Sequence, residues 1–220
     1  MLFRSRELIE RSWPVLASHE VNAIRRDLGE NPATSIWLWG QGRMPSLPRF
    51  RDQYGVNGAV IAAVDLVRGI GRLIGWDLID VEGATGYLDT NYAGKGQATV
   101  DAIDRYDLVA VHVEAADEAG HDGNVDEKVK AIERIDAHVV GPVLARLQSL
   151  DEPWRVLIAP DHPTPVARQI HTTDPPPFAM AGQGIVGVLK KPFTEDNARE
   201  SDLHIDRGHE LMEFFLHGNR

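Results

Sequence analysis

Short apolar runs alternate with helical segments along most of the chain, and this alternation restricts the fold more than any other feature. The runs are rich in valine, isoleucine and leucine, which is typical of buried strands. They lie at Ser35–Trp39, Gly58–Ala62, Trp76–Val81, Leu108–Val113, Arg155–Ala159 and Gly184–Leu189. Strands that alternate with helices predict an α/β fold, with a mostly parallel sheet and helices on both faces.

The segments between these runs have the apolar spacing of helices. The longest should begin at Asn124, which forms a capping box with Glu127, and we expect Gly141-Pro142 to kink it. The polar segment Gly83–Lys95 is predicted to be a loop. Further helices are predicted at residues 3–28 with an interruption near Pro14, and at 49–54, 64–74, 97–105 and 210–216.

Composition narrows the class of protein. The 220 residues are enough for one domain, and 43% hydrophobic with 25% charged residues is typical of a globular protein. No apolar run approaches the roughly 20 residues that span a bilayer, and the charged start is unlike a secretory signal, so we expect a cytoplasmic protein. The absence of cysteine excludes disulfides and thiolate metal sites. A net charge of −10 argues against nucleic acid and membrane partners.

Histidine and aspartate gather where two predicted strands end. Asp117 and His121 follow one strand at a spacing of four residues, Asp161 and His162 follow another, and His171 lies in the loop beyond. Carboxylate with imidazole suits Mn²⁺, Zn²⁺, Co²⁺ or Mg²⁺. Two such ions about 4 Å apart would suit phosphoryl transfer. The spacing alone leaves open a structural role for each of these side chains at a strand end.

Several long segments resemble one known family. They are HVEAADEAGHDGNVDEKVKAIERIDAHVVGPVL, APDHPTPVARQIHTTDPPPF, NPATSIWLWGQG, GAVIAAVDLVRGIGRLIGWDLIDVEGATGYLDTNYAGK and HELMEFFL. In their order along the chain, they resemble the carboxyl-terminal portion of the archaeal-type cofactor-independent (2,3-bisphosphoglycerate-independent) phosphoglycerate mutases, of the alkaline phosphatase superfamily. The resemblance covers nearly the whole chain. It implies an alkaline-phosphatase-like core that lacks its amino-terminal part.

The resemblance also implies an activity and a ligand set. The family interconverts 3-phosphoglycerate and 2-phosphoglycerate, a step of glycolysis, through a phosphoserine and two divalent ions. Asp117, His121 and His171 match the ligands of one ion, and Asp161 and His162 match two ligands of the other. Family members are longer at the amino end, where they carry the serine nucleophile and a further metal-binding aspartate. The resemblance therefore predicts no catalytic serine in this chain, and it leaves open whether one ion or both are retained.

The same resemblance implies substrate-binding residues and an organisation of the chain. Lys95 and Arg25 are predicted to bind a small phosphorylated metabolite, although Lys95 also fits a solvated loop residue. Residues 1–30 are predicted to be a helical segment at the junction with a missing inserted domain, and residues 31–220 to be the partial core.

Two other functions remain open on the sequence. The chain could be a non-catalytic or split subunit that binds metal or an amino-terminal partner, or a related metallophosphatase that acts on another phosphorylated metabolite. If a central strand belongs to the missing part, two unpaired strand edges need a separate amino-terminal half or a homo-oligomer to cover them.

Overall fold

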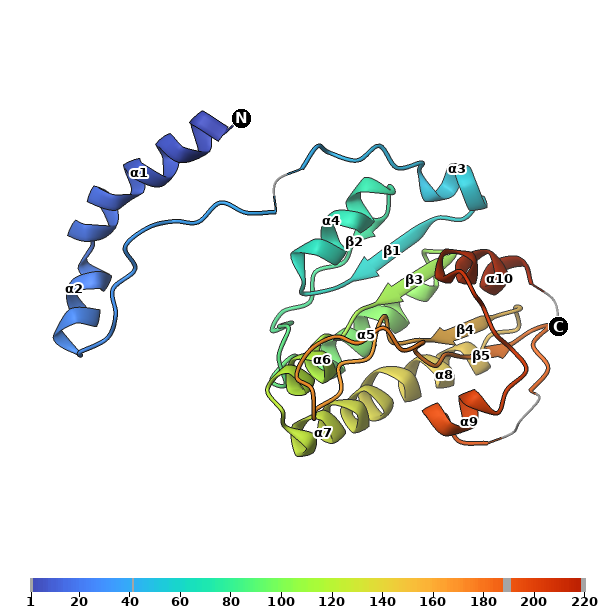
Figure 1. Cartoon of the computed structure of the whole chain (residues 1–220). Coiled ribbons are helices and arrows are strands. Elements are labelled where there is room, and N and C mark those ends of the chain that lie inside the picture. The colour runs from blue at the N-terminus through green and yellow to red at the C-terminus, as the bar shows by residue number, and fades with distance from the viewer. Residues whose placement is uncertain (1, 41, 188–190, 219–220) are drawn as a thin grey trace. The chain divides into compact units, whose positions relative to one another are not determined.

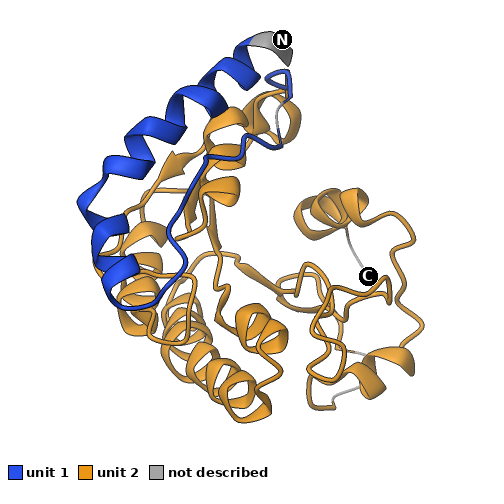
Figure 2. Ribbon diagram, turned by 60° about the vertical axis from the view of Figure 1, so that its left-hand side comes forward, with its two compact units in different colours: residues 1–46 blue, residues 47–220 orange. Residues whose placement is uncertain are grey.

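The computed structural model describes residues 2–40, 42–187 and 191–218. The chain divides into two compact units, Met1–Ser46 and Leu47–Arg220 (Figure 2). The predicted division at residue 30 stays a prediction. Within the described residues, no helix combines the length and the apolar character needed to cross a membrane.

The first unit consists of two helices and an extended segment. Helix α1 spans Leu2–Ser18 and α2 spans Glu20–Asp27. The predicted interruption near Pro14 is wrong, because α1 continues through this proline, which removes only one backbone donor. The helices separate at His19, whose ring accepts a hydrogen bond from the Val21 amide and caps α2.

The strand predicted at Ser35–Trp39 is also absent, because its polar groups bond to helix side chains and not to a neighbouring strand. The Ile36 amide donates to the Ser12 hydroxyl at 3.1 Å, and the Trp13 indole donates to the Ser35 hydroxyl at 3.0 Å. A strand needs a partner ladder, and this segment remains extended without one.

The second unit carries the sheets. A three-stranded parallel sheet has the order β2-β1-β3, where β1 is Gly58–Ile61, β2 is Asp77–Leu78 and β3 is Leu108–Val111. A separate antiparallel pair consists of β4, Arg155–Ile158, and β5, Ala179–Gly182. The helices are α3 Phe50–Tyr54, α4 Asp65–Leu73, α5 Tyr92–Ile103, α6 Ala115–His121, α7 Val125–Ile135, α8 Gly141–Gln148, α9 Glu195–Arg199 and α10 Leu211–His217 (Figure 1). The predicted α/β fold with a parallel sheet is confirmed.

The core lies around β1, all four residues of which are buried. On one face, Val60 packs with Phe50, Trp76 and apolar residues of α4 and α10. Helix α5 packs on β1 and β3. Apolar burial of this kind stabilises the fold by roughly 25 cal/mol per Å² removed from water, so the sheet and its helices form the rigid base of the unit.

The strand predicted at Gly184–Leu189 is wrong over its described part, residues 184–187, and residues 188–189 lie outside the described residues. The strand lies earlier, as β5. Gly182 and Gly184 have φ of 122° and 73°, values that favour glycine and end the strand in a turn.

One helix start and one expected kink differ from the sequence prediction. Helix α5 begins at Tyr92 because the Asn91 side chain accepts the Gly94 amide at 2.8 Å, so Lys95 lies on a helix and not in the predicted loop. One hydrogen bond of the predicted capping box is confirmed, since the Asn124 side chain accepts a hydrogen bond from the Glu127 amide. The kink expected at Gly141-Pro142 is replaced by a π-helical turn at Asp136–Val140.

The π turn allows two helices to approach closely. Pro142 has no amide to donate to the His138 carbonyl, and the Gly141 amide bonds to Asp136. The His138 carbonyl faces Gly96 on α5, where an added Cβ would lie 1.9 Å from the oxygen. Only glycine fits at this position of α5, and the helix that carries Lys95 is held here.

Candidate metal centre

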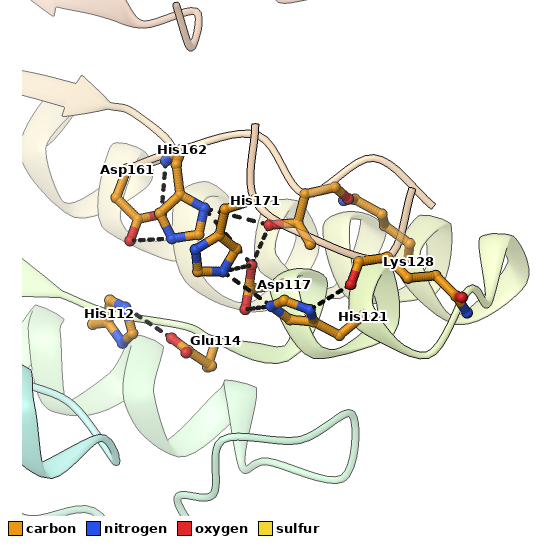
Figure 3. A network of polar contacts seen from close by, with 10 residues as sticks. His112, Glu114, Asp117, His121, Lys128, Asp161, His162 and His171 are labelled. Atoms are coloured by element: carbon orange, nitrogen blue, oxygen red, sulfur yellow. Dashed lines mark hydrogen bonds and ion pairs between the residues drawn. The ribbon is translucent and has the colours of Figure 1, made fainter. Parts of the chain in front are cut away.

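The five predicted metal ligands lie in one polar network (Figure 3). Asp117 and His121 are four residues apart on α6, which follows β3, so both side chains lie on one helix face. Asp161 and His162 follow β4, and His171 lies farther along the same loop. The site is therefore at the carboxyl ends of β3 and β4, where α/β folds place functional residues.

The first predicted ligand set consists of Asp117, His121 and His171. Oδ2 of Asp117 lies 3.3 Å from Nε2 of His121, and Oδ1 lies 3.5 Å from Nε2 of His171. The two Nε2 atoms are 3.0 Å apart. Ligands held about 2.0–2.1 Å from one tetrahedral Zn²⁺ lie roughly 3.3 Å from each other. These separations therefore fit a divalent ion, and the three residues form a group that could hold one.

Backbone contacts orient the His121 ring. Its Nδ1 lies 3.0 Å from the Gln169 carbonyl oxygen, which can only accept, so Nδ1 donates and Nε2 keeps its lone pair for a ligand. Gln169 has a φ of 56°, in the left-handed region that costs a non-glycine residue about 1 kcal/mol or more. The loop thus stores some strain to place this carbonyl.

Thr164 orients Asp117. Its buried hydroxyl donates to Oδ1 of Asp117, and its carbonyl accepts a 2.6 Å bond from Lys128 Nζ. The same carbonyl packs on Gly120, where a Cβ would come within 2.5 Å. The sequence prediction missed this role of Thr164. Its position two residues after His162 was the available signal.

The second predicted ligand pair, Asp161 and His162, combines an exposed carboxylate with a ring that lies against the first set. The His162 ring stacks on His171 with centroids 3.7 Å apart, and its Nδ1 lies 3.8 Å from Oδ1 of Asp117. Its Nε2 lies 3.3 Å from Oδ2 of Asp161. The Asp161 side chain is 72% exposed, whereas that of Asp117 is 19% exposed. The pair thus adjoins the first set through His162, and Asp161 faces solvent.

Acidic residues at the start of α6 form a second group that the sequence prediction missed. Glu114, Asp117 and Glu118 have carboxylate oxygens close enough to share a cation. Nε2 of His112 also lies 3.1 Å from Oε2 of Glu114. The spacing of four between Glu114 and Glu118 was the sequence signal. These carboxylates add negative charge beside Asp117.

Lys95 is fully buried beneath the β3–α6 corner. Its Nζ donates to the His112 carbonyl at 3.2 Å. Burial lowers the pKa of Lys95, and the nearby Glu114 partly offsets this effect. The role of Lys95 in substrate binding stays a prediction. Arg25 belongs to the first unit, where its Nε donates to the Asn31 carbonyl at 2.7 Å, and its role also stays a prediction.

An α/β core with aspartate and histidine side chains gathered at the carboxyl ends of its strands is an arrangement found in metal-dependent enzymes. The chain belongs to the metalloenzyme superfamily, whose family model matches residues 19–217. Its curated relatives are 2,3-bisphosphoglycerate-independent phosphoglycerate mutases, as the resemblance predicted.

Two relatives show the extent of the similarity. The 2,3-bisphosphoglycerate-independent phosphoglycerate mutase of Methanothrix thermoacetophila is 49% identical over 212 residues, covering 96% of this chain and 54% of that protein. The probable 2,3-bisphosphoglycerate-independent phosphoglycerate mutase of Geobacter sulfurreducens is 47% identical over 211 residues, covering 96% of this chain and 53% of that protein. The chain thus spans about half the length of the curated relatives it matches.

Solved structures agree on the fold. The PH0037 protein from Pyrococcus horikoshii superposes with a TM-score of 0.83 at 32% identity, over 94% of this chain and 54% of that one. The cofactor-independent phosphoglycerate mutase from Thermoplasma acidophilum has a TM-score of 0.60 at 22% identity, over 94% and 49%, which supports the fold alone.

Proposed function

We propose that this chain provides the aspartate and histidine ligands of a metal-dependent phosphoryl-transfer enzyme that interconverts 3-phosphoglycerate and 2-phosphoglycerate. The observation that carries the proposal is the convergence of Asp117, His121 and His171, with ligand atoms 3.0 to 3.5 Å apart. The names of the relatives, at 47–49% identity over nearly the whole chain, support the choice of reaction.

The residues of this chain have distinct tasks in that reaction. Asp117, His121 and His171 would hold a divalent ion such as Mn²⁺, Zn²⁺, Co²⁺ or Mg²⁺, and Asp161 with His162 would offer ligands to a second. A bound ion supplies positive charge for a phosphoryl oxygen. Thr164 keeps the Asp117 carboxylate in place, and Gln169 keeps the His121 ring in its ligand tautomer. In this proposal the phosphoryl-accepting serine comes from outside the chain.

A non-catalytic or split-subunit function is the second candidate, and the open Asp161–His162 pair favours it. Both groups that could hold an ion in the described part of the chain include Asp117, and neither includes Asp161 or His162. A site that is complete on one side and open on the other is expected of a chain that binds metal but needs a partner for turnover.

The test is a mutase assay with Mn²⁺, in which 2-phosphoglycerate formed from 3-phosphoglycerate is coupled to enolase. The chain is assayed alone and with the portion of the Methanothrix thermoacetophila mutase that it does not match, made as a separate polypeptide. We expect no turnover by the chain alone and metal-dependent turnover by the mixture, which Asp117→Asn in the chain abolishes.

Other outcomes separate the alternatives. Release of inorganic phosphate from 3-phosphoglycerate without 2-phosphoglycerate would make the protein a metallophosphatase. Turnover that survives both EDTA and Asp117→Asn would overturn the proposal. Metal binding without turnover in either preparation would leave the non-catalytic function standing in its place. A role in glycolysis and a cytoplasmic location also belong to this proposal.

A further inference from the structure

Lys128 on α7 directs its charge at a backbone carbonyl group. The side chain is partly buried, and its Nζ donates to the Thr164 carbonyl oxygen at 2.6 Å. Among the described residues, no carboxylate forms an ion pair with this ammonium group. Fixing a long side chain costs conformational entropy, and partial burial removes solvation from its charge. A hydrogen bond from a charged donor is stronger than a neutral one, so this bond holds the Thr164 backbone in place.

Thr164 connects this bond to the predicted metal ligands. The residue is 3% exposed. Its carbonyl accepts a hydrogen bond from α7, while its hydroxyl donates to Oδ1 of Asp117 and lies 3.3 Å from Nδ1 of His162. The carbonyl and the hydroxyl belong to one residue, so a shift of its backbone moves the hydroxyl away from the carboxylate. A bond to the carbonyl therefore acts on the orientation of Asp117.

Gly120 brings the same carbonyl against α6. An added Cβ at Gly120 would lie 2.5 Å from the Thr164 carbonyl oxygen and 3.0 Å from Lys128 Nζ. The backbone of α6 and the loop after β4 thus meet at a point where only glycine leaves room. Asp117 and His121 lie on either side of Gly120 on this helix. The lysine therefore joins α7 to the loop beside two predicted ligands (Figure 3).

The loop of residues 163–171 makes a second contact with the same corner. Gly123, between α6 and α7, has a φ of 71°, and an added Cβ there would lie 2.3 Å from Nε2 of Gln169. The Gln169 carbonyl oxygen lies 3.0 Å from Nδ1 of His121. The Thr172 amide closes the base of this loop with a 3.0 Å bond to a carbonyl at its start. Two glycines thus allow the loop to approach the corner, and both contacts lead to a ligand side chain.

We propose that Lys128 is a positioning residue that holds the loop of residues 163–171 against α6 and thereby sets the affinity of the first predicted ligand set for a divalent ion. Lys128 acts through Thr164 and does not contact the ion. His171, the third member of that set, belongs to the loop itself. The inference rests on the proposed function, because it assumes that these ligands hold an ion. The part that concerns the loop can be tested in the metal-free chain.

Lys130 provides a matched control on the same helix. It is exposed, lies two residues beyond Lys128, and forms no side-chain hydrogen bond or ion pair with another described residue. Lys130→Met and Lys128→Met therefore change the net charge equally and introduce the same side chain. An effect of overall charge on metal binding would appear in both variants, whereas an effect of the Thr164 bond appears only in Lys128→Met.

The first experiment measures the Mn²⁺ affinity of the full chain by isothermal titration. We expect Lys128→Met to weaken binding by about tenfold, a loss typical of changes to residues that orient metal ligands. Lys130→Met should stay within about threefold of the wild type. Lys128→Arg keeps a charged donor for the same carbonyl, so it should recover most of the lost affinity. Thermal melting of each variant checks its folding.

The second experiment uses the metal-free chain and does not depend on ion binding. At about pH 8, where an ordinary imidazole is neutral, ¹⁵N NMR shows which ring nitrogen of His121 carries the proton. The wild type should carry it on Nδ1, facing the Gln169 carbonyl. In Lys128→Met both tautomers should appear, and the Thr172 amide should exchange faster with solvent, because the loop is held less firmly. Lys130→Met should match the wild type in both measurements.

Equal Mn²⁺ affinities of Lys128→Met and Lys130→Met would overturn the inference and leave the metal site standing. If Lys128→Met does not fold, Lys128→Gln takes its place under the same criteria. If the wild type does not bind Mn²⁺, the proposed function fails, and the metal-free spectra still decide whether Lys128 holds the loop. An unchanged His121 tautomer with unchanged exchange at Thr172 in the variant would show that it does not.

Discussion

The two parts of the ligand cluster differ in how firmly the chain holds them. Asp117 is mostly buried on α6, and Thr164 fixes its carboxylate while His121 and His171 face it. Asp161 is mostly exposed and contacts the cluster through the neighbouring His162. The first set lies on two segments of the chain that pack on each other, while the second follows β4, which pairs with β5 alone among the described strands. Other side chains thus hold Asp117 in place, whereas Asp161 is exposed and contacts the cluster only at His162 among the described residues.

The largest effect is expected from Asp117, the residue that both parts share. Its carboxylate contacts His121, His171 and His162, so Asp117→Asn removes the only charge among these ligand contacts. We expect Mn²⁺ and Zn²⁺ affinity to fall by more than about 100-fold, beyond the loss typical of outer-shell changes. Isothermal titration measures it. An affinity that stays within about threefold would mean that the ion binds elsewhere.

A pair of histidine substitutions compares the two parts directly. His171→Ala removes a ligand of the first set, and His162→Ala removes the stacked neighbour that belongs to the second. We expect His171→Ala to weaken binding of the first ion at least about tenfold more than His162→Ala does. Equal losses would show that the cluster is one site, and the reverse order would show that His162 is the main ligand.

A smaller effect is expected from the hydroxyl that orients Asp117. Thr164→Val keeps the shape but loses the bond to the carboxylate, so metal affinity should fall by about tenfold. The free energy of unfolding should fall by about 1–3 kcal/mol, because the bond involves a charged group.

Thr172→Val is the matched control for this change. The Thr172 hydroxyl is buried, and none of the described residues hydrogen-bonds to it. Its replacement should leave metal affinity unchanged and stability equal or higher. If both valine variants behave alike, the Thr164 bond does not orient the ligand.

The smallest effect is expected on the pH dependence of stability, and it concerns Lys95, which is buried under the corner that joins β3 to α6. Burial lowers the pKa of Lys95 in the folded state, so the unfolded chain holds that proton more readily. Stability of the wild type should therefore rise with pH from the lowered folded pKa up to the ordinary lysine pKa. Lys95→Met should lack this rise in urea unfolding as the pH approaches the ordinary lysine pKa from below. Parallel pH profiles for the two proteins would contradict the assigned burial.

Much of the fold could be predicted because β1, β3 and β4 are short apolar runs between helices, a pattern that depends on local sequence. The errors arise where residues distant in the sequence determine whether a segment pairs as a strand. Ser35–Trp39 has a strand-like composition but bonds to side chains of α1. Strand β4 has the sequence of a parallel strand but pairs with β5 in antiparallel fashion. No local pattern specifies which neighbour a strand finds.

The site could be predicted in its ligand types but not in its supports. Asp117 and His121 have the spacing of one helix turn, and Asp161 and His162 follow an apolar run, so both pairs could be recognised. Thr164 and Gln169 act through a hydroxyl and a backbone carbonyl that any loop contains. Thr164 and Gln169 contact Asp117 and His121 only because the loop after β4 packs on α6, and the local sequence does not specify this packing.

Anomalous diffraction from crystals of the chain soaked in Mn²⁺ tests the central claim most directly. The account predicts a strong peak bound by Asp117, His121 and His171, and a weak peak or none beside Asp161 and His162. A peak of equal or greater strength at Asp161 and His162, or no peak at the first set, would contradict it.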